Sequence, residues 1–117
     1  MSASPEVYPG QRPRPLKQEF HMVNVAFENV RVEDLDDSER TCTVTGVCGT
    51  ESLRMVIRFP EQYPNYGIPT FDLIESSMSN KMAIPRLLKV LRDTASKHSK
   101  RNSLEPLLRS LSATLDS

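Results

Sequence analysis

The side chains best suited to chemistry are two cysteines and two histidines, Cys42, Cys48, His21 and His98. A thiolate can act as a nucleophile or bind a metal, and an imidazole can move protons near neutral pH. Six residues of strand separate the two cysteine Cα atoms by roughly 20 Å, whereas a disulfide needs about 5.5 Å. No Cys-x-x-Cys or His-x-x-x-His spacing supplies two neighbouring metal ligands. Because both cysteines share the parity of Val44 in a strand-like run, we expect both thiols to face the core.

The hydroxyls and carboxylates do not form a catalytic set either. The serines lack a nearby histidine in the sequence and a nucleophile-elbow context, and no glycine-rich phosphate loop is present. The acids gather in one acidic segment, where solvation explains them: Glu28, Glu33, Asp34, Asp36, Asp37 and Glu39. We therefore predict no catalytic, cofactor-binding or metal-ligating residue, and a protein that is not an enzyme and uses no cofactor.

Length and charge narrow the class further. A chain of 117 residues is one domain that can build its own core. The 15 basic residues balance the 15 acidic ones, so no overall field favours nucleic acid or an anionic membrane. No apolar run is long enough to insert into a membrane, and the N-terminus has no hydrophobic signal core. The expected location is cytoplasmic.

A proline-rich segment, residues 59–69, is the most informative motif. Its three prolines cannot extend a central sheet ladder, because each fixes its own φ and lacks an N–H. We predict a rigid, mostly extended crossing with tight turns, held to the fold by the rings of Tyr63 and Tyr66. An ordinary proline-rich turn is the alternative, but it would explain only the prolines and would leave the apolar side chains of the segment unburied. The structural motif comprises Phe59, Pro60, Tyr63, Pro64 and Pro69.

The elements around this motif follow from periodicity. Residues 1–14 are rich in proline without an apolar period, which predicts a disordered tail or linker. A helical pattern of apolar residues then begins at Leu16. The pattern does not define where this helix ends, because Val23, Val25 and Phe27 also alternate as in a strand. Strands are expected at 30–33, 41–48, 53–59 and 70–74, with an acidic turn at 34–39. Leu53, Met55, Ile57 and Phe59 share one face, as in a meander covered on one side.

Two helices complete the chain. The first carries an apolar stripe from Ile84 to Ala95 and is capped by Ser79 or a nearby residue, and the second follows Ser103 as its cap. The order is one helix, four strands and two helices. It predicts an α+β fold in which the helices pack on one face of an antiparallel meander.

The pattern Phe-Pro-x-x-Tyr-Pro, followed by a further proline and placed between the third and fourth strands, resembles the RWD domain, a relative of the ubiquitin-conjugating enzymes. The resemblance covers Leu16 to Leu115, so we assign the RWD domain to residues 15–117. The spacer from Pro64 to Pro69 has four residues, where many RWD domains have three. Five segments resemble the RWD domain of a WD-repeat subunit of the GATOR assembly: Gln18–Phe20, Cys42–Val44, Phe59–Asn65, Leu87–Ala95 and Leu104–Arg109.

This resemblance implies a non-catalytic interaction and assembly module. The WD-repeat scaffold that contains this module would promote amino-acid-dependent TOR signalling at the lysosomal membrane surface, and its partners would be other GATOR subunits. Ubiquitin-conjugating enzymes carry their nucleophilic cysteine after the last strand of the meander, but no cysteine follows Cys48 here. Two alternatives stay open. The chain could recruit a ubiquitin-system or kinase partner in another pathway, or it could be a degenerate conjugating-enzyme variant that still binds ubiquitin.

The expected partner face is the open side of the sheet, where Arg54 and Arg58 stand among threonines. The second candidate is the outer face of the first C-terminal helix, which carries Arg86, Lys89 and Arg92.

Overall fold

The computed structural model describes residues 13–23 and 27–116. Its elements, in chain order, are α1 (Leu16–Met22), β1 (Val30–Asp36), β2 (Thr41–Cys48), β3 (Glu51–Arg58), β4 (Thr70–Ser76), α2 (Ala83–Lys97) and α3 (Leu104–Asp116). The predicted α+β class with a four-stranded antiparallel sheet is confirmed. Residues 1–12 of the predicted tail lie outside the described residues.

The sheet is a meander in the order β1-β2-β3-β4. Val44 of β2 stands opposite Met55 of β3, and both lie on the buried face. The register shifts once in each edge strand, at Glu33 in β1 and at Ile74 in β4, so each of these residues is extra to the ladder.

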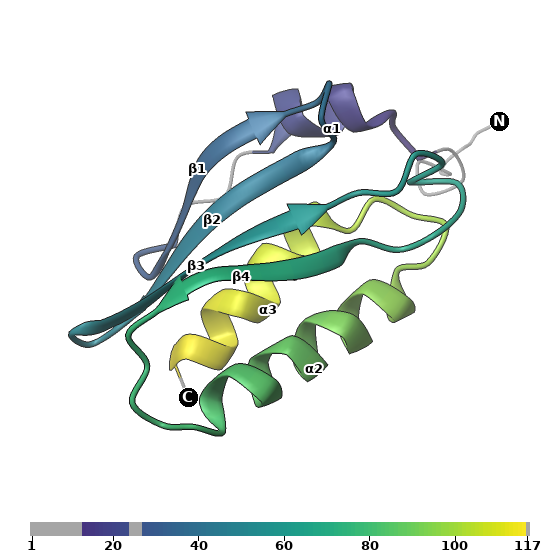
Figure 1. Ribbon diagram of the computed structural model, residues 1–117. Helices are drawn as coiled ribbons and strands as arrows, with labels where there is room; N and C mark the ends of the chain where they lie inside the picture. Colours follow the sequence, from purple (N-terminus) through teal and green to yellow (C-terminus); the bar gives the residue numbers. More distant parts are fainter. Residues whose placement is uncertain (1–12, 24–26, 117) are drawn as a thin grey trace, which may run out of the picture.

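The core lies between the inner face of the sheet and the two C-terminal helices, which Figure 1 shows on the same side of the sheet. β3 presents Leu53, Met55 and Ile57 to the core, and α3 presents an almost continuous leucine stripe. Gly46 in β2 allows α3 to lie close, because a Cβ there would be 2.5 Å from Cδ1 of Leu115. Burial of this apolar surface is the main stabilising term of the fold.

Some boundaries differ from the prediction. Because α1 already ends at Met22, Phe27 is not on the helix and forms an isolated bridge with Val30. β1 continues to Asp36, so half of the predicted acidic turn is strand. Ser79 does not cap α2, since its N–H and hydroxyl both donate to Glu51. Within the described part of the chain, no helix has the length and apolar character needed to cross a bilayer.

Candidate functional site

The proline-rich segment folds into compact turns between β3 and β4. Backbone bonds from Tyr63 N to Pro60 O (3.0 Å) and from Asn65 N to Gln62 O (2.9 Å) close these turns. The segment is therefore more tightly turned than the mostly extended crossing we predicted. The Tyr63–Pro64 peptide is cis.

One tyrosine, not two, holds the segment to the fold. The ring of Tyr63 is 4% exposed, and its centroid lies 4.8 Å from that of Phe59. Phe59 in turn contacts Phe20 of α1 edge-on, with 5.6 Å between the centroids. Tyr66 is 61% exposed, so the prediction that its ring also anchors the segment is wrong. It follows the turn that Tyr63 closes, and the chain has already left the core at that point.

The hydroxyl of Tyr63 belongs to a buried polar cluster that joins three elements. It donates to the carboxylate of Glu19 in α1 (2.8 Å to Oε1) and accepts from the N–H of Ser103 (2.7 Å). The same carboxylate accepts from the first N–H of α3, at Leu104 (3.0 Å), and from Asn102 Nδ2 (2.9 Å). A carboxylate suits this place because the N-terminus of a helix carries partial positive charge. Glu19, rather than a serine side chain, thus supplies the bond to the first amide of α3.

Burial has a clear electrostatic effect on Tyr63. Loss of solvent raises the pKa of its hydroxyl above the ordinary value, and the negative charge of Glu19 adds to the effect. The hydroxyl therefore stays protonated and remains a hydrogen-bond donor. Its role in this geometry is structural.

Arg40 holds the same segment from the other side. Its guanidinium donates to three backbone carbonyls: from Nε to Phe59 (3.3 Å), from Nη2 to Pro60 (2.8 Å) and from Nη2 to Tyr63 (2.8 Å). Arg40 lies in the β1–β2 turn with φ of 59°. The rigid fork of arginine can satisfy several acceptors at once, which lysine cannot do.

The two thiols have different surroundings. Cys42 is fully buried, and burial followed by the charges of Asp34 and Glu19 raises its pKa to about 12. Cys48 is exposed, so the prediction that both thiols face the core is wrong. Its parity is that of Val44, but it is the last residue of β2, beside the Gly49 turn and at the end of α3, where the core stops.

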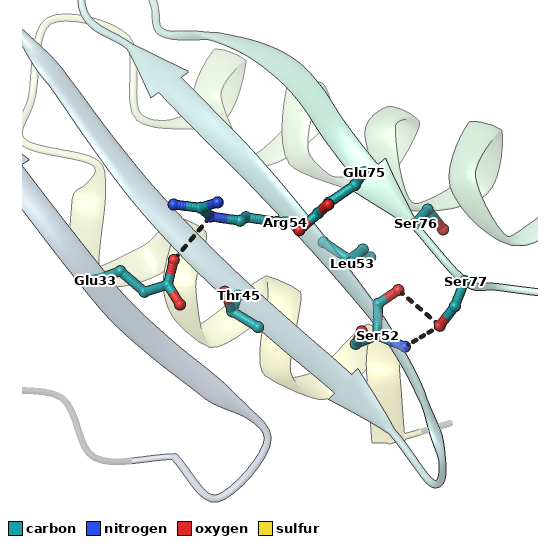
Figure 2. A pocket seen from close by; sticks show the side chains of 8 residues that line it. All are labelled: Glu33, Thr45, Ser52, Leu53, Arg54, Glu75, Ser76 and Ser77. Carbon is teal, nitrogen blue, oxygen red and sulfur yellow. Dashed lines mark hydrogen bonds and ion pairs between the residues drawn. The ribbon is translucent and has the colours of Figure 1, made fainter.

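The outer face of the sheet is polar. Nε of Arg54 lies 2.9 Å from Oε1 of Glu33, and Arg58 forms an ion pair with Asp72. Figure 2 shows Glu75 of the adjacent strand β4 and Glu33 of β1, one strand further away, on either side of Arg54. These residues line an open depression of about 490 Å³. Hydroxyl side chains complete its lining, among them Thr45, Ser52 and Ser77. The predicted sheet-face arginines thus share one surface, and each already has an acidic partner.

The predicted helix-face residues form a separate group. Arg86, Lys89 and Arg92 are exposed on α2, on the side opposite its buried Leu87 and Leu91. Nζ of Lys89 lies 3.1 Å from the carboxylate of Asp93 one turn later. The two basic groups are not brought together, because the helices cover the inner face of the sheet and the arginines of β3 project from the outer face.

Sequence reasoning missed Glu19 and Arg40. Glu19 could have been found, because it falls three residues after Leu16 and directly before Phe20, on the face that α1 buries. Arg40 offered no such pattern, since a turn residue has no periodicity.

Comparisons with known proteins locate the chain among larger proteins. No family model matches it. Over 107 residues, or 90% of the chain, it is 43% identical to the GATOR2 complex protein WDR59 of Gallus gallus and 41% identical to that of Homo sapiens. A stretch of 74 residues is 32% identical to an uncharacterized RWD, RING finger and WD repeat-containing protein of Schizosaccharomyces pombe. The chain spans 11% of the length of the WDR59 proteins and 6% of that of the yeast protein. The predicted resemblance to a WD-repeat subunit of the GATOR assembly is confirmed.

Proposed function

We propose that this relative of the WDR59 proteins is a non-catalytic, RWD-type module for protein interaction and assembly. It acts within a WD-repeat scaffold of the GATOR assembly that promotes amino-acid-dependent TOR signalling, and its partners are other subunits of that assembly. It works from the cytoplasm at the lysosomal membrane surface. The observation that carries the proposal is the identity of 41–43% to WDR59 over 90% of the chain.

The surroundings of the thiols support a role without catalysis. A nucleophilic cysteine needs an accessible thiolate. Cys42 is buried with a raised pKa, and Cys48 lies at the β2–β3 turn rather than after β4. Neither position matches the site at which conjugating enzymes form their thioester.

The outer face of the sheet is the proposed partner surface. Arg54 and Arg58 are each bound through Nε in their ion pairs, so their terminal nitrogens can still donate to a partner. Arginine is favoured at interfaces because its planar fork binds carboxylates and backbone carbonyls with defined geometry.

The test is recovery of GATOR2 subunits by the tagged chain from cells fed with amino acids. We expect the wild-type chain to recover them, and Arg54→Glu combined with Arg58→Glu to weaken recovery without unfolding the domain. Adding Glu33→Arg and Asp72→Arg to that variant re-forms both ion pairs with the charges exchanged. This control separates loss of a partner contact from loss of the internal pairs.

Three outcomes would redirect the proposal. Recovery that survives sheet-face reversal but fails on reversing Arg86, Lys89 and Arg92 would move the interface to α2. Recovery of a ubiquitin ligase or a kinase instead of GATOR2 subunits would favour the alternative pathway. A reducible ubiquitin adduct at either cysteine, after incubation with an activating enzyme, would overturn the non-catalytic assignment.

A further inference from the structure

β4 exposes apolar side chains at an edge of the sheet. Leu73 is 38% exposed and Ile74 is 50% exposed, and six of the seven residues of β4 are exposed. Only β3 pairs with it, since β4 is last in the sheet order (Figure 1). The helices leave it poorly covered because α2 packs chiefly against α3. An apolar edge strand of this kind is a ready template for pairing with another chain.

The segment that follows β4 turns away from this edge. Ser77 N donates to Ser52 O (2.8 Å), and Ser79 N donates to the carboxylate of Glu51 (3.0 Å). Both acceptors belong to β3, so these bonds lie at the edge of β4 that is already paired and leave the opposite edge free. Across residues 13–23 and 27–116, no other segment forms backbone hydrogen bonds with the outer edge of β4.

The other edge of the sheet is protected. β1 carries Glu33, Asp34 and Asp36 within four positions, and charged side chains on an edge strand discourage further pairing. β4 has its own irregularity at Ile74, but Thr70 to Leu73 pair with β3 in regular register. That stretch of β4 contains no bulge that would hinder an added strand.

Charge indicates which kind of strand would fit. β4 contains Asp72 and Glu75 and no basic residue. Asp72 already pairs with Arg58, whereas no ion pair within the described ranges uses Glu75. A second copy paired at this edge would add its own Asp72 and Glu75 carboxylates and no basic side chain of β4. Because like charges repel, a basic partner segment fits this edge better than another copy.

We propose that β4 binds an extended, basic and aliphatic segment of a partner protein as a fifth strand. An aliphatic side chain on one face of the segment contacts Leu73, one on the other face contacts Ile74, and a lysine or arginine lies near Glu75. Backbone hydrogen bonds supply affinity in this mode, and alternate side chains supply specificity. The inference rests on the proposed interaction function and assigns a second surface to it, distinct from the open face.

The probe is a set of seven-residue peptides, the length of β4, in which valine alternates with threonine and lysine is placed at each position in turn. The 117-residue chain is isotopically labelled, and amide hydrogen exchange is followed residue by residue. We expect at least one lysine peptide to bind and to slow exchange of β4 amides. The same peptide with glutamate in place of lysine should bind more weakly, because it meets Glu75 with a like charge.

Substitutions localise the effect. Ile74→Lys should weaken binding by about tenfold or more, since it removes one buried aliphatic contact and adds a like charge. Val47→Lys is the control, because Val47 is likewise an exposed aliphatic residue (38%, against 50% for Ile74) but lies on an inner strand. Glu75→Lys should reverse the preference, so that the glutamate peptide binds better than the lysine peptide.

The proposal fails if no peptide of either set protects β4 amides, or if Ile74→Lys and Val47→Lys weaken binding equally. It also fails if the chain dimerises through β4 without peptide, which would make a second copy the occupant. Loss of GATOR2 recovery would leave these peptide measurements unchanged, so failure of the proposed function can be told from failure of this inference.

Discussion

Replacing Tyr63 by alanine tests whether the proline-rich segment is part of the core. The side chain is 4% exposed and packs at 4.8 Å from the ring of Phe59. Truncation of a buried aromatic side chain costs about 3–5 kcal/mol of unfolding free energy. Domains of this size are stable by only about 5–15 kcal/mol, so Tyr63→Ala removes a large share of the total.

Tyr63→Phe separates the hydroxyl from the ring. This change leaves the N–H of Ser103 without its acceptor and removes one donor from Glu19. An unsatisfied buried polar group costs about 1–3 kcal/mol, so we expect a loss in that range. Because both side chains belong to one hydrogen-bonded cluster, the effects of Tyr63→Phe and Glu19→Gln should not be additive.

Urea denaturation of the purified chain measures these losses. With a slope of about 2 kcal/mol per molar urea, Tyr63→Ala should lower the midpoint by about 2 M. Tyr66→Ala is the control within the same segment: the ring is 61% exposed, so its loss should stay within about 0.5 kcal/mol. A Tyr63→Ala midpoint within error of the Tyr66→Ala midpoint would refute the reasoning, because it would place the segment outside the cooperative core.

The remaining predictions concern Arg40 and the two cysteines. Arg40→Lys keeps the charge but not the fork that binds the carbonyls of residues 59, 60 and 63, so it should cost about 1–3 kcal/mol in the same urea assay; an unchanged midpoint would contradict this role. Cys48 should react quickly with a water-soluble thiol reagent in the native state and Cys42 only after denaturation, which Cys48→Ser and Cys42→Ala variants assign; equal native rates would contradict the structure. The pKa of Cys42 is raised from 9.0 to about 12, so the unfolded chain loses this proton first, and stability is complete below pH 9 and falls as pH rises toward 12. Between pH 9 and pH 10, below the ordinary pKa of Tyr63, the unfolding free energy of the wild type should fall by up to about 1.4 kcal/mol more than that of Cys42→Ala. Parallel pH profiles of the two proteins would rule out a contribution from the Cys42 thiol.

The sequence predicted the elements whose pattern repeats. Alternation from Leu53 to Ile57 sets β3 and its inner face, and the leucines of residues 104–115 set α3. These predictions succeed because an entire face must be apolar to be buried, so several residues carry the same information. The placement of Arg54 and Arg58 on the outer face followed from the same alternation.

Features that depend on where the core ends were not predictable in this way. Cys48 has the parity of a core residue but lies beyond the cover of α3, and Tyr66 lies only three residues after a buried tyrosine. The parity of a strand residue predicts which face of the sheet it lies on. It does not predict whether the helix that covers this face extends far enough to bury the residue. Arg40 acts through backbone carbonyls, which every sequence contains, so its identity alone does not reveal the contact.

The buried polar side chains are held by partners inside the domain. Glu19, Ser103 and Ser112 are the buried polar side chains of the described chain. Glu19 and Ser103 belong to the cluster around Tyr63, and the hydroxyl of Ser112 donates to Asn29 Oδ1 (2.6 Å). Each has a hydrogen-bond partner within the chain. The two proposed partner surfaces differ in kind: the outer face offers charges that are already paired, whereas the edge of β4 offers apolar side chains and a carboxylate outside any described ion pair. Because paired surface charges contribute little to binding and burial of aliphatic side chains contributes more, β4 should supply the larger part of the affinity.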